Sequence, residues 1–343
     1  MSLLPNAARC SPPRILVVRF GAMGDIIQTL PAVADLRRGV PDAKIAWAVD
    51  SRWRELLVGN QDIDEAIGVR LRSWLSPGAR PGESAGEALR RLRRNDFDLA
   101  LDMQGLVKSA AVAAASNAKT VAGLDHRLLR EPHAALLYDR RLDTASTHVV
   151  DRYRELAAMA TGSSPSPEAR FQLPPGELRS GLPERYVLTS AQAGWGAKQW
   201  PRERYSELAA RLWNEHRIPL VVDCVPGEEA HANAIRAAAP EGAVHSHPST
   251  LPQLIGATRR ATAVVGVDSG PLHLAAALAR PGVAIFGPTD PARNGPYGSS
   301  MTVLRASDAE TTYKRTTEPS SSMRAWSADA IYRELVPRLN SVD

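Results

Sequence analysis

Short apolar runs alternate along the chain with segments whose apolar residues recur at helical spacing. In the first half, such runs occupy residues 14–20, 44–50 and 97–105, and a helix-like segment follows each of them. Continuous apolar runs of this length are typical of buried strands in a parallel sheet, with helices as the crossover connections. The pattern therefore predicts an α/β fold built on doubly wound parallel sheets.

A break in the alternation divides the chain in two. Residues 161–185 are rich in Pro, Ser and Gly and show no sustained period, which is typical of a linker. Apolar runs such as 218–224 then return, and 343 residues are enough to bury two cores. We predict two Rossmann-like domains, residues 1–165 and 185–343, joined by a linker at 166–184. A ligand would bind in the cleft between them.

Composition narrows the classes of function. The two cysteines, Cys10 and Cys224, are too far apart in the sequence for a metal-binding spacing, which suits a reducing compartment. No stretch approaches the ~18 consecutive apolar residues of a membrane span, and the N-terminus lacks the apolar core of a signal peptide. Only 5% of the residues are aromatic, so nucleic acid is not an expected partner. These features predict a soluble, cytoplasmic protein.

The positive charge is concentrated in one segment. The net charge is +5, and seven arginines lie within residues 70–94. The sequence GEALRRLRRNDF in this segment is typical of an amphipathic helix with solvated charges. Arg70 and Arg72, in contrast, follow a strand-like run, and ligands of α/β proteins bind in the loops after strands. These two arginines are therefore either solvated surface charges or contacts for an anion.

The first apolar run leads into a glycine-containing turn, ILVVRFGAMGDIIQTL at residues 15–30. A dinucleotide-binding fingerprint needs three glycines, and Arg19 stands where the first of them would be. Asp50, at the end of the second run, could still serve as the ribose-binding acid, so an NAD-dependent oxidoreductase remains an alternative. Asp25 opens the following helix, where it is either a helix cap or a general base beside the glycines.

A second turn of chemical interest lies within residues 264–291. An apolar strand ends at Asp268, Ser269 and Gly270 form a tight turn, and a helix follows with a proline in its first turn. Backbone N–H groups at such a helix start, together with the helix dipole, form a site suited to a diphosphate. His273 lies one turn into the helix, where it either faces the same anion or is an ordinary histidine.

Six segments resemble, in the right order, the motifs of one enzyme family. They are RFGAMGDIIQTLPAV, FDLALDMQGLVKSA, REPHAALLYDRR, THVVDRYREL, GWGAKQWP and GVDSGPLHLAAAL, spread over about residues 14–300. Together they are similar to the ADP-heptose:lipopolysaccharide heptosyltransferases, most closely to the type I members. The resemblance implies the glycosyltransferase B fold, in which two Rossmann-like domains face each other across a cleft. It also implies that the C-terminal helix, SADAIYRELVPRL, packs back on the N-terminal domain.

The activity that the resemblance implies is inverting transfer of L-glycero-D-manno-heptose from ADP-heptose to Kdo of Kdo2-lipid A, in the biosynthesis of the lipopolysaccharide inner core. Asp25 would take the proton from the acceptor hydroxyl. The implied donor-binding residues are Lys198 on a phosphate, Glu228 on the ribose, and Ala193, Gly194, Asp268, Ser269, Gly270 and His273. A lysine and a helix N-terminus would stabilise the leaving diphosphate, so neither a metal nor another cofactor is expected. Without the resemblance, Lys198 is interpreted as a surface lysine.

The implied acceptor presents phosphates and carboxylates, which planar guanidinium groups bind well. The acceptor-binding residues that the resemblance implies are Gly24, Arg70, Arg72, Gln104, Lys108, Arg130, His148 and Arg152. Gln104 and Lys108 have an alternative interpretation, as a strand end and a helix surface. A lipid acceptor also implies transient contact with the inner-membrane surface. We expect a monomeric enzyme, peripheral on the cytoplasmic face of the inner membrane.

Three alternatives remain. The first is a member of the same family with another nucleotide-sugar donor or another acceptor, for example a heptosyltransferase II-like enzyme. The second is a non-catalytic sugar-nucleotide binder, and the third is the NAD-dependent oxidoreductase. Positions 193, 194 and 196 are Ala, Gly and Gly where better-known family members carry hydroxyl and acidic side chains, so donor contacts there would come from the backbone. The sequence assigns no role to residues 306–324.

Overall fold

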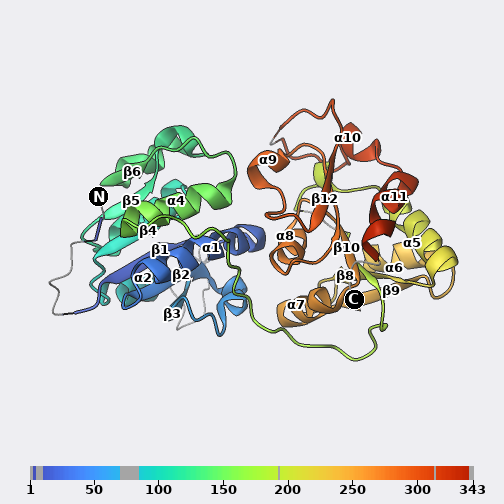
Figure 1. The fold of residues 1–343 in the computed structure, drawn as a ribbon, viewed down its shortest axis with the longest axis horizontal. Coiled ribbons are helices and arrows are strands. Elements are labelled where there is room, and N and C mark those ends of the chain that lie inside the picture. The colour runs from blue at the N-terminus through green and yellow to red at the C-terminus, as the bar shows by residue number, and fades with distance from the viewer. Residues whose placement is uncertain (1–2, 5–10, 70–84, 192–193, 313, 340–343) are drawn as a thin grey trace. The chain divides into compact units, whose positions relative to one another are not determined.

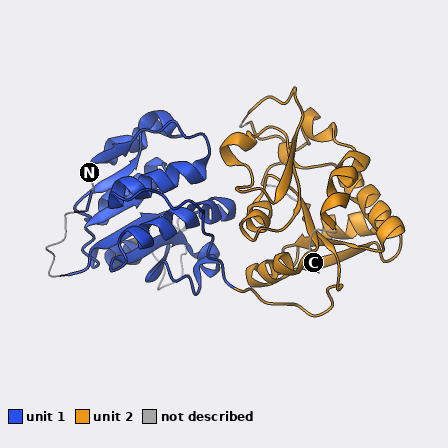
Figure 2. Ribbon diagram, in the orientation of Figure 1, with its two compact units in different colours: residues 1–174 blue, residues 175–343 orange. Residues whose placement is uncertain are grey.

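The computed structural model describes residues 3–4, 11–69, 85–191, 194–312 and 314–339. It divides into two compact units, Met1–Pro174 and Pro175–Asp343, which Figure 2 shows in separate colours. The division falls within the segment 166–184, where the regular alternation of the sequence is interrupted. Each unit has its own sheet and its own core.

Unit 1 is built on a parallel sheet with the strand order β3-β2-β1-β4-β5-β6 (Figure 1). Its strands are β1 (Arg14–Val18), β2 (Lys44–Asp50), β3 (Glu65–Val69), β4 (Leu99–Asp102), β5 (Val121–Leu124) and β6 (Arg140–Leu142). Its helices are α1 (Met23–Gly39), α2 (Ala85–Arg93), α3 (Val107–Ala115) and α4 (Val149–Thr161), with 3-10 turns η1 (Ser51–Leu57), η3 (His126–Leu128) and η4 (Pro132–Leu137). The strand order changes direction between β1 and β4. The loops after these two strands therefore leave the edge of the sheet at the switch point, where α/β proteins bind ligands.

The core of unit 1 fixes the start of α1 against the central strand. Ile15 and Val18 of β1 are fully buried, as expected for a strand that is covered on both faces. The first turn of α1 buries Met23, Gly24 and Ile26, and the helix packs along α4. Asp25, which lies between these buried residues in the sequence, is therefore carried on a well-packed turn.

Unit 2 repeats the architecture with the strand order β12-β11-β10-β7-β8-β9, again all parallel (Figure 1). Its strands are β7 (Val187–Ser190), β8 (Leu220–Cys224), β9 (Val244–Pro248), β10 (Ala263–Val267), β11 (Gly282–Phe286) and β12 (Met301–Arg305). The helical segments are η5 (Gly196–Lys198), α5 (Arg202–His216), α6 (Ala230–Ala237), α7 (Leu251–Arg260), α8 (Gly270–Ala277), α9 (Pro291–Asn294), α10 (Ser321–Arg324) and α11 (Ala328–Leu339). Here the switch point lies between β7 and β10. The loops that carry Lys198 and Asp268 follow these two strands.

The last helix, α11, is part of the core of unit 2. Ile331, Leu335 and Leu339 are buried in the same apolar cluster as the central strands, and the helix packs against α5, β10 and β11. These side chains fill the space between α5 and the sheet. The additional packing of this helix on the N-terminal domain, which the resemblance implies, stays a prediction.

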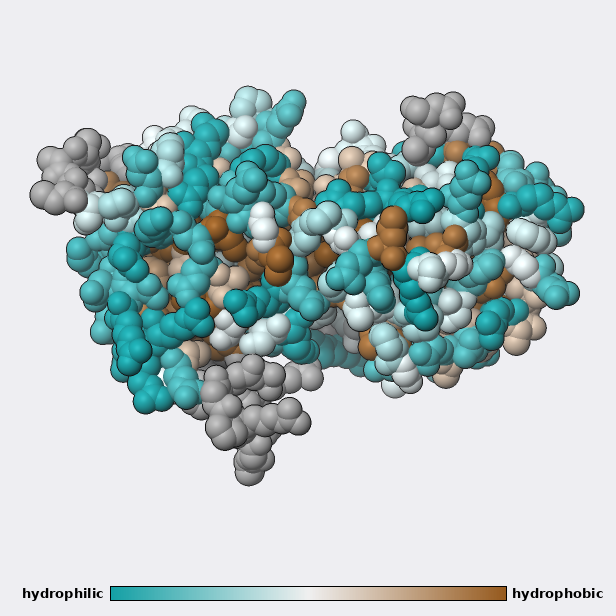
Figure 3. All heavy atoms as spheres, turned by 90° about the horizontal axis from the view of Figure 1, so that it is seen from below, coloured by the Kyte–Doolittle hydropathy of each residue, from teal (hydrophilic) through white to brown (hydrophobic). Residues whose placement is uncertain are grey.

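Apolar side chains are mainly inside both units. The face drawn in Figure 3 is largely hydrophilic, with separate smaller apolar areas. Leu136, at 73% exposure, is the most exposed large aliphatic side chain among the described residues. Within the part of the chain that the structure describes, every helix is too short or too polar to cross a lipid bilayer.

Candidate active site

Asp25 is both a helix cap and an accessible carboxylate. Its Oδ2 accepts a hydrogen bond of 2.8 Å from the backbone N–H of Ala22, which closes the first turn of α1. Its Oδ1 lies 2.7 Å from Nη2 of Arg19, yet the Asp25 side chain is still 37% exposed. The two interpretations drawn from the sequence are therefore compatible, because the capping contact uses one edge of the carboxylate and leaves part of the group accessible.

Arg19 is a site residue that the sequence prediction missed. Its side chain is 6% exposed, and Nη1 donates to the hydroxyl of Tyr153 on α4, at 3.0 Å, and to the backbone oxygen of Met103 after β4. From the sequence, Arg19 was considered only as the residue that replaces the first glycine of a dinucleotide-binding fingerprint. The signal that could have identified it is its place as the first residue of the segment RFGAMGD, six residues before Asp25.

Gln104 connects the loops after β1 and β4. Its Oε1 accepts a hydrogen bond of 2.9 Å from the backbone N–H of Phe20. The backbone N–H of Gln104 donates, at 2.8 Å, to Oδ1 of Asp102 at the end of β4. The side-chain oxygen of Gln104 therefore already has a hydrogen-bond partner within the protein. For this oxygen, the contact supports the structural interpretation of Gln104 as part of a strand end.

The carboxylate of Asp102 organises this junction from within the core. It is 1% exposed, and it accepts hydrogen bonds from the hydroxyls of Tyr138 and Ser109, at 2.7 and 2.8 Å, and from the N–H groups of Gln104 and Gly105. Burial raises the pKa of Asp102, although these hydrogen bonds act in the opposite direction. The loop after β4 is thus fixed by a single buried side chain.

The other predicted acceptor-side residues follow the carboxyl ends of neighbouring strands of unit 1. Lys108, in the first turn of α3 after β4, and Arg130, after β5, are exposed. His148, after β6, is the N-cap of α4, and its Nδ1 accepts from the N–H of Val150 at 3.2 Å. Nε of Arg152 donates to the backbone oxygen of Ser146 at 2.7 Å. Because β1, β4, β5 and β6 are neighbours in the sheet, these residues and Asp25 belong to one edge.

Three predicted site residues cannot be placed. Arg70, Arg72 and Ala193 lie outside the described residues. Gly24 is buried in the first turn of α1, directly before Asp25, and Gly194 is exposed in the loop after β7.

In unit 2, Lys198, Asp268 and His273 form a connected group. Nζ of Lys198 lies 2.5 Å from Oδ2 of Asp268, and Nε2 of His273 lies 3.5 Å from Oδ1 of the same carboxylate. The three side chains are between 7% and 14% exposed. Burial alone would raise the pKa of Asp268, but the hydrogen bond from His273 and the charge of Lys198 hold it well below its usual range. Asp268 is thus an ionised carboxylate between two cationic or polar groups.

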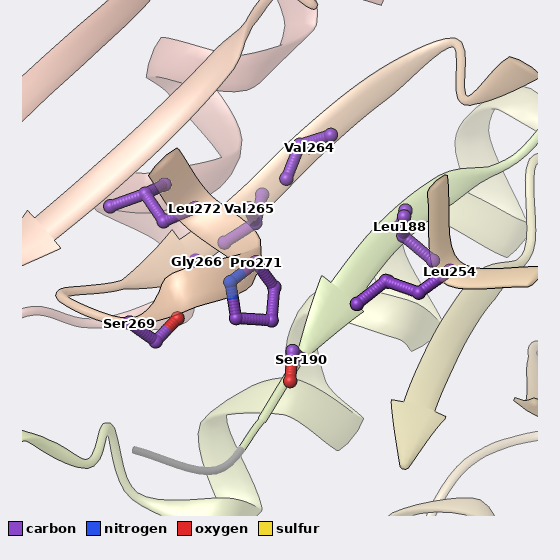
Figure 4. A pocket seen from close by; sticks show the side chains of 9 residues that line it. All are labelled: Leu188, Ser190, Leu254, Val264, Val265, Gly266, Ser269, Pro271 and Leu272. Atoms are coloured by element: carbon purple, nitrogen blue, oxygen red, sulfur yellow. The ribbon is translucent and has the colours of Figure 1, made fainter. Parts of the chain in front are cut away.

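The turn after Asp268 presents the start of α8. Ser269 is the N-cap of this helix, yet its hydroxyl makes no capping hydrogen bond and is buried without a partner among the described residues. Figure 4 shows Ser269 and Pro271 beside a small cavity, across from Ser190 and Leu254. The cavity holds only about 10 Å³, the room of about one water molecule. This cavity is therefore too small for a nucleotide.

The loop that carries Lys198 is covered by residues from the far end of the chain. The Nζ of Lys198 lies 4.5 Å from the ring centre of Trp195, and the guanidinium carbon of Arg315 lies 6.0 Å from the same centre. A Cβ on Gly196 would be 1.9 Å from the backbone oxygen of Thr317, so only glycine allows this approach. Residues 314–320, to which the sequence assigned no role, therefore form part of the surroundings of Lys198.

Two further residues follow other strands of unit 2, and one of them, Glu228, is a predicted donor contact. Glu228, after β8, is exposed. Thr289, after β11, has a buried hydroxyl without a hydrogen-bond partner among the described residues. Within those same residues, no group of three or more His, Cys, Asp or Glu side chains is arranged to hold a metal ion.

Comparison with protein families decides the assignment. Residues 86–323 match the model described as glycosyltransferase family 9 (heptosyltransferase). The chain belongs to glycosyltransferase family 9. This assignment excludes the NAD-dependent oxidoreductase that the sequence left open.

Individual members of the family are similar over most of their length. The lipopolysaccharide heptosyltransferase 1 of Escherichia coli K12 is 33% identical over 304 residues, which cover 85% of this chain and 93% of that protein. The protein of the same name from Pseudomonas aeruginosa is 34% identical over 302 residues, 85% of this chain and 83% of that protein. The solved structure of E. coli heptosyltransferase WaaC with ADP has a TM-score of 0.80 and 28% identity, and covers 95% of this chain and 99% of that chain.

The family match also confirms the fold class. This glycosyltransferase has two parallel α/β sheets of the kind found in glycosyltransferase B enzymes, as the alternation of the sequence predicted. The assignment of roles to individual site residues stays a prediction. What the structure adds is that Asp25 and Gln104 follow the two strands at the switch point of unit 1, and that Lys198 and Asp268 follow those at the switch point of unit 2. Arg130, His148 and Glu228 follow neighbouring strands.

Proposed function

We propose that this glycosyltransferase transfers L-glycero-D-manno-heptose from ADP-heptose to Kdo of Kdo2-lipid A, with inversion at the anomeric carbon. The observation that carries the proposal is the match along nearly the whole chain to proteins named lipopolysaccharide heptosyltransferase 1. The placement of an accessible carboxylate at the switch point of unit 1 and of a lysine at that of unit 2 supports it. One unit supplies the base and the other supplies positive charge for the leaving group.

On the donor side, we infer that Lys198 exchanges its partner when ADP-heptose binds. The lysine is held by Asp268 in the described structure, and a phosphate oxygen competes for the same ammonium group. The N–H groups at the start of α8 offer hydrogen bonds to the same diphosphate. With this positive potential, the departing ADP is stabilised without a metal ion.

On the acceptor side, we infer that Asp25 accepts the proton of the Kdo hydroxyl as that oxygen attacks the anomeric carbon. The bond to ADP breaks as the new glycosidic bond forms, and the proton ends on Asp25. Lys108, Arg130, His148 and Arg152, with Arg70 and Arg72, would bind the phosphates and carboxylates of the acceptor. A lipid acceptor places a monomeric enzyme in transient contact with the cytoplasmic face of the inner membrane.

The experiment that tests the proposal is a matrix of donors and acceptors. Purified protein is incubated with ADP-heptose, ADP-mannose or UDP-glucose, each with deacylated Kdo2-lipid A or with the same acceptor already carrying one heptose. We expect turnover only for ADP-heptose with the unheptosylated acceptor, and an inverted anomeric configuration by NMR. Turnover of the heptosylated acceptor alone would establish the heptosyltransferase II-like alternative. Another preferred donor would overturn the assignment of ADP-heptose, and binding without turnover would favour a non-catalytic sugar-nucleotide binder.

A further inference from the structure

The carboxylate of Asp25 is held from two sides. Nη2 of Arg19 lies 2.7 Å from its Oδ1, and the N–H of Ala22 donates to its Oδ2 at 2.8 Å. An aspartate in the first turn of a helix needs only the backbone contact to act as a cap. The second contact, from a buried guanidinium, therefore calls for another explanation.

Arg19 is itself fixed by three separate elements. Its Nη1 donates to Tyr153 on α4 and to the backbone oxygen of Met103 after β4. Its own backbone oxygen accepts from Nε1 of Trp47 on β2, at 3.1 Å. Burial alone would lower the pKa of Arg19, but Asp25, Tyr153 and Asp102 more than offset this effect, so the group stays cationic. The guanidinium thus has one available position.

Stability is a weak reason for burying this cation. A buried guanidinium loses its hydration, and an ion pair with a carboxylate that stays partly exposed offsets only part of that cost. Nε of Arg19 is moreover buried without a hydrogen-bond partner among the described residues, which adds a desolvation cost. A contact that adds little stability and carries such a cost is expected where orientation matters.

A fully buried pair in the same unit provides the contrast. Nε of Arg154, on α4, lies 2.8 Å from Asp35 on α1, and both side chains are almost completely buried, at 7% and 6% exposure. In the Arg19 pair the cation is 6% exposed and the carboxylate is 37% exposed. The Arg154 pair therefore joins two helices inside the protein. The Arg19 pair presents its carboxylate to the exterior.

We propose that Arg19 is the positioning residue of the general base, and that it holds the Asp25 carboxylate in one orientation with an accessible edge for the acceptor hydroxyl. The inference rests on the proposed function, because it acts through Asp25. The contact with Arg19 removes alternative rotamers of Asp25, and orientation contributes strongly to rate. When Asp25 takes the proton, Arg19 keeps its hydrogen bonds to Tyr153 and Met103.

The experiment compares Arg19→Met and Arg19→Lys with the matched pair Arg154→Met and Arg154→Lys in the full-length chain. For each variant, kcat and both KM values are measured with deacylated acceptor, below the melting temperature. We expect Arg19→Met to lower kcat on the order of 30–100-fold with both KM values nearly unchanged, because the Asp25 carboxylate loses its fixed orientation. Arg19→Lys, which keeps the charge, should restore kcat to within about fivefold of the wild type. The Arg154 variants should lower the melting temperature but not kcat.

Two further measurements make the result decisive. In a double-mutant cycle, Arg19→Met should add almost nothing to the loss caused by Asp25→Asn, because both remove the same function. Crystal structures of the two Arg19 variants report the Asp25 rotamer without any substrate. The proposal would be overturned if the Asp25 rotamer is unchanged in Arg19→Met or if the losses in the double-mutant cycle are additive. A kcat of Arg19→Met within about threefold of the wild type would also overturn it. If ADP-heptose is not the donor, the proposed function fails. The role of Arg19 is then still tested by the Asp25 rotamer and by the kcat of the variants with the substrates that the protein does use.

Discussion

Lys198 and Asp268 form an ion pair whose side chains are only 14% and 10% exposed. A charge removed from water to this degree needs a partner at every stage, since breaking a buried pair on one side costs several kcal/mol. His273 lies on the other oxygen of Asp268, 3.5 Å away. At the residue scale, Asp268 therefore keeps a neighbour if Lys198 exchanges its partner as proposed.

Asp223, at the end of β8, provides a pH-dependent test at the same scale. Burial raises the pKa of Asp223 to about 7, while the hydrogen bond from Ser249 acts in the opposite direction. Because the native pKa lies above the unfolded value, the protonated group favours folding below about pH 4, and this contribution is lost as the pH rises through 7.

We expect Asp223→Asn, which can still accept from Ser249, to stabilise the protein increasingly between pH 4 and 7. The gain over the wild type should reach the order of a few kcal/mol. Urea denaturation of both proteins at several pH values measures the difference. A difference that stays constant with pH would show that Asp223 titrates normally.

At the scale of elements, loops that leave the switch points are joined by side chains from neighbouring strands. In unit 1, Asp102 fixes the loop after β4, and Gln104 in that loop accepts from Phe20 in the loop after β1. In unit 2, Gly196 allows the segment around Thr317 to cover the loop after β7. Each functional loop is thus supported by an element that is distant in sequence.

Two substitutions of Gln104 separate its structural role from its predicted contact with the acceptor. Gln104→Ala leaves the buried N–H of Phe20 without its acceptor, which should lower the free energy of unfolding by about 1–3 kcal/mol and reduce kcat. Gln104→Glu retains the oxygen and should keep both near wild type. If the acceptor KM rises sharply in Gln104→Glu, the side-chain nitrogen of Gln104 contacts the anionic acceptor, as the resemblance implies. Steady-state kinetics and urea denaturation measure both effects.

Gly196→Ala tests the cover over the Lys198 loop. The new Cβ would lie 1.9 Å from the oxygen of Thr317, so the backbone of one segment has to move. We expect a loss of about 1–3 kcal/mol in stability and weaker binding of ADP. Gly194→Ala is the matched control for stability, because a Cβ there meets no atom within 4 Å. Equal stability of the two variants would show that the segment around Thr317 moves aside easily.

At the scale of the whole molecule, the candidate site residues are divided between two compact units. Asp25 and the predicted acceptor-side residues belong to unit 1, and Lys198, Asp268 and His273 belong to unit 2. Each unit has its own core, so a surface substitution in one leaves the packing of the other unchanged.

This division predicts opposite kinetic effects for two cationic side chains. Arg130→Ala, in unit 1, should raise the acceptor KM about tenfold or more and leave the donor KM unchanged, because a charge-assisted contact contributes about 1.5–3 kcal/mol. Lys198→Ala, in unit 2, should raise the donor KM and weaken ADP binding. The effect of Arg130→Ala should shrink at high salt, where the wild-type contact is already screened.

The control for the lysine is Lys119→Ala, which removes an exposed ion pair with Asp98 in unit 1. It should change neither KM, because surface pairs contribute little. Steady-state kinetics with both substrates varied, at low and high salt, measure all three variants. Equal damage to both KM values in Arg130→Ala would mean that the fold of unit 1 is disturbed and that Arg130 is not an acceptor contact.

The sequence by itself determined the class of fold and the edges at which chemistry is placed. Buried parallel strands and their crossover helices impose local periods on the chain, so the alternation is visible without any tertiary information. Asp25 and Asp268 could be selected because each lies where an apolar strand leads into a helix, Asp25 in the first turn of α1 and Asp268 directly after β10. Parallel sheets bring such positions to the ligand-binding edge.

The tertiary structure alone decided which side chains meet. Arg19 and Tyr153 are 134 positions apart, and Lys198 and Asp268 are 70 apart, so no local pattern pairs them. Strand order decides such contacts: β1 lies beside β4, and β10 lies beside β7, although other strands intervene in the sequence. For the same reason the sequence left Arg19 and the segment around Arg315 without a role, since their function depends on partners that only the folded sheet brings close.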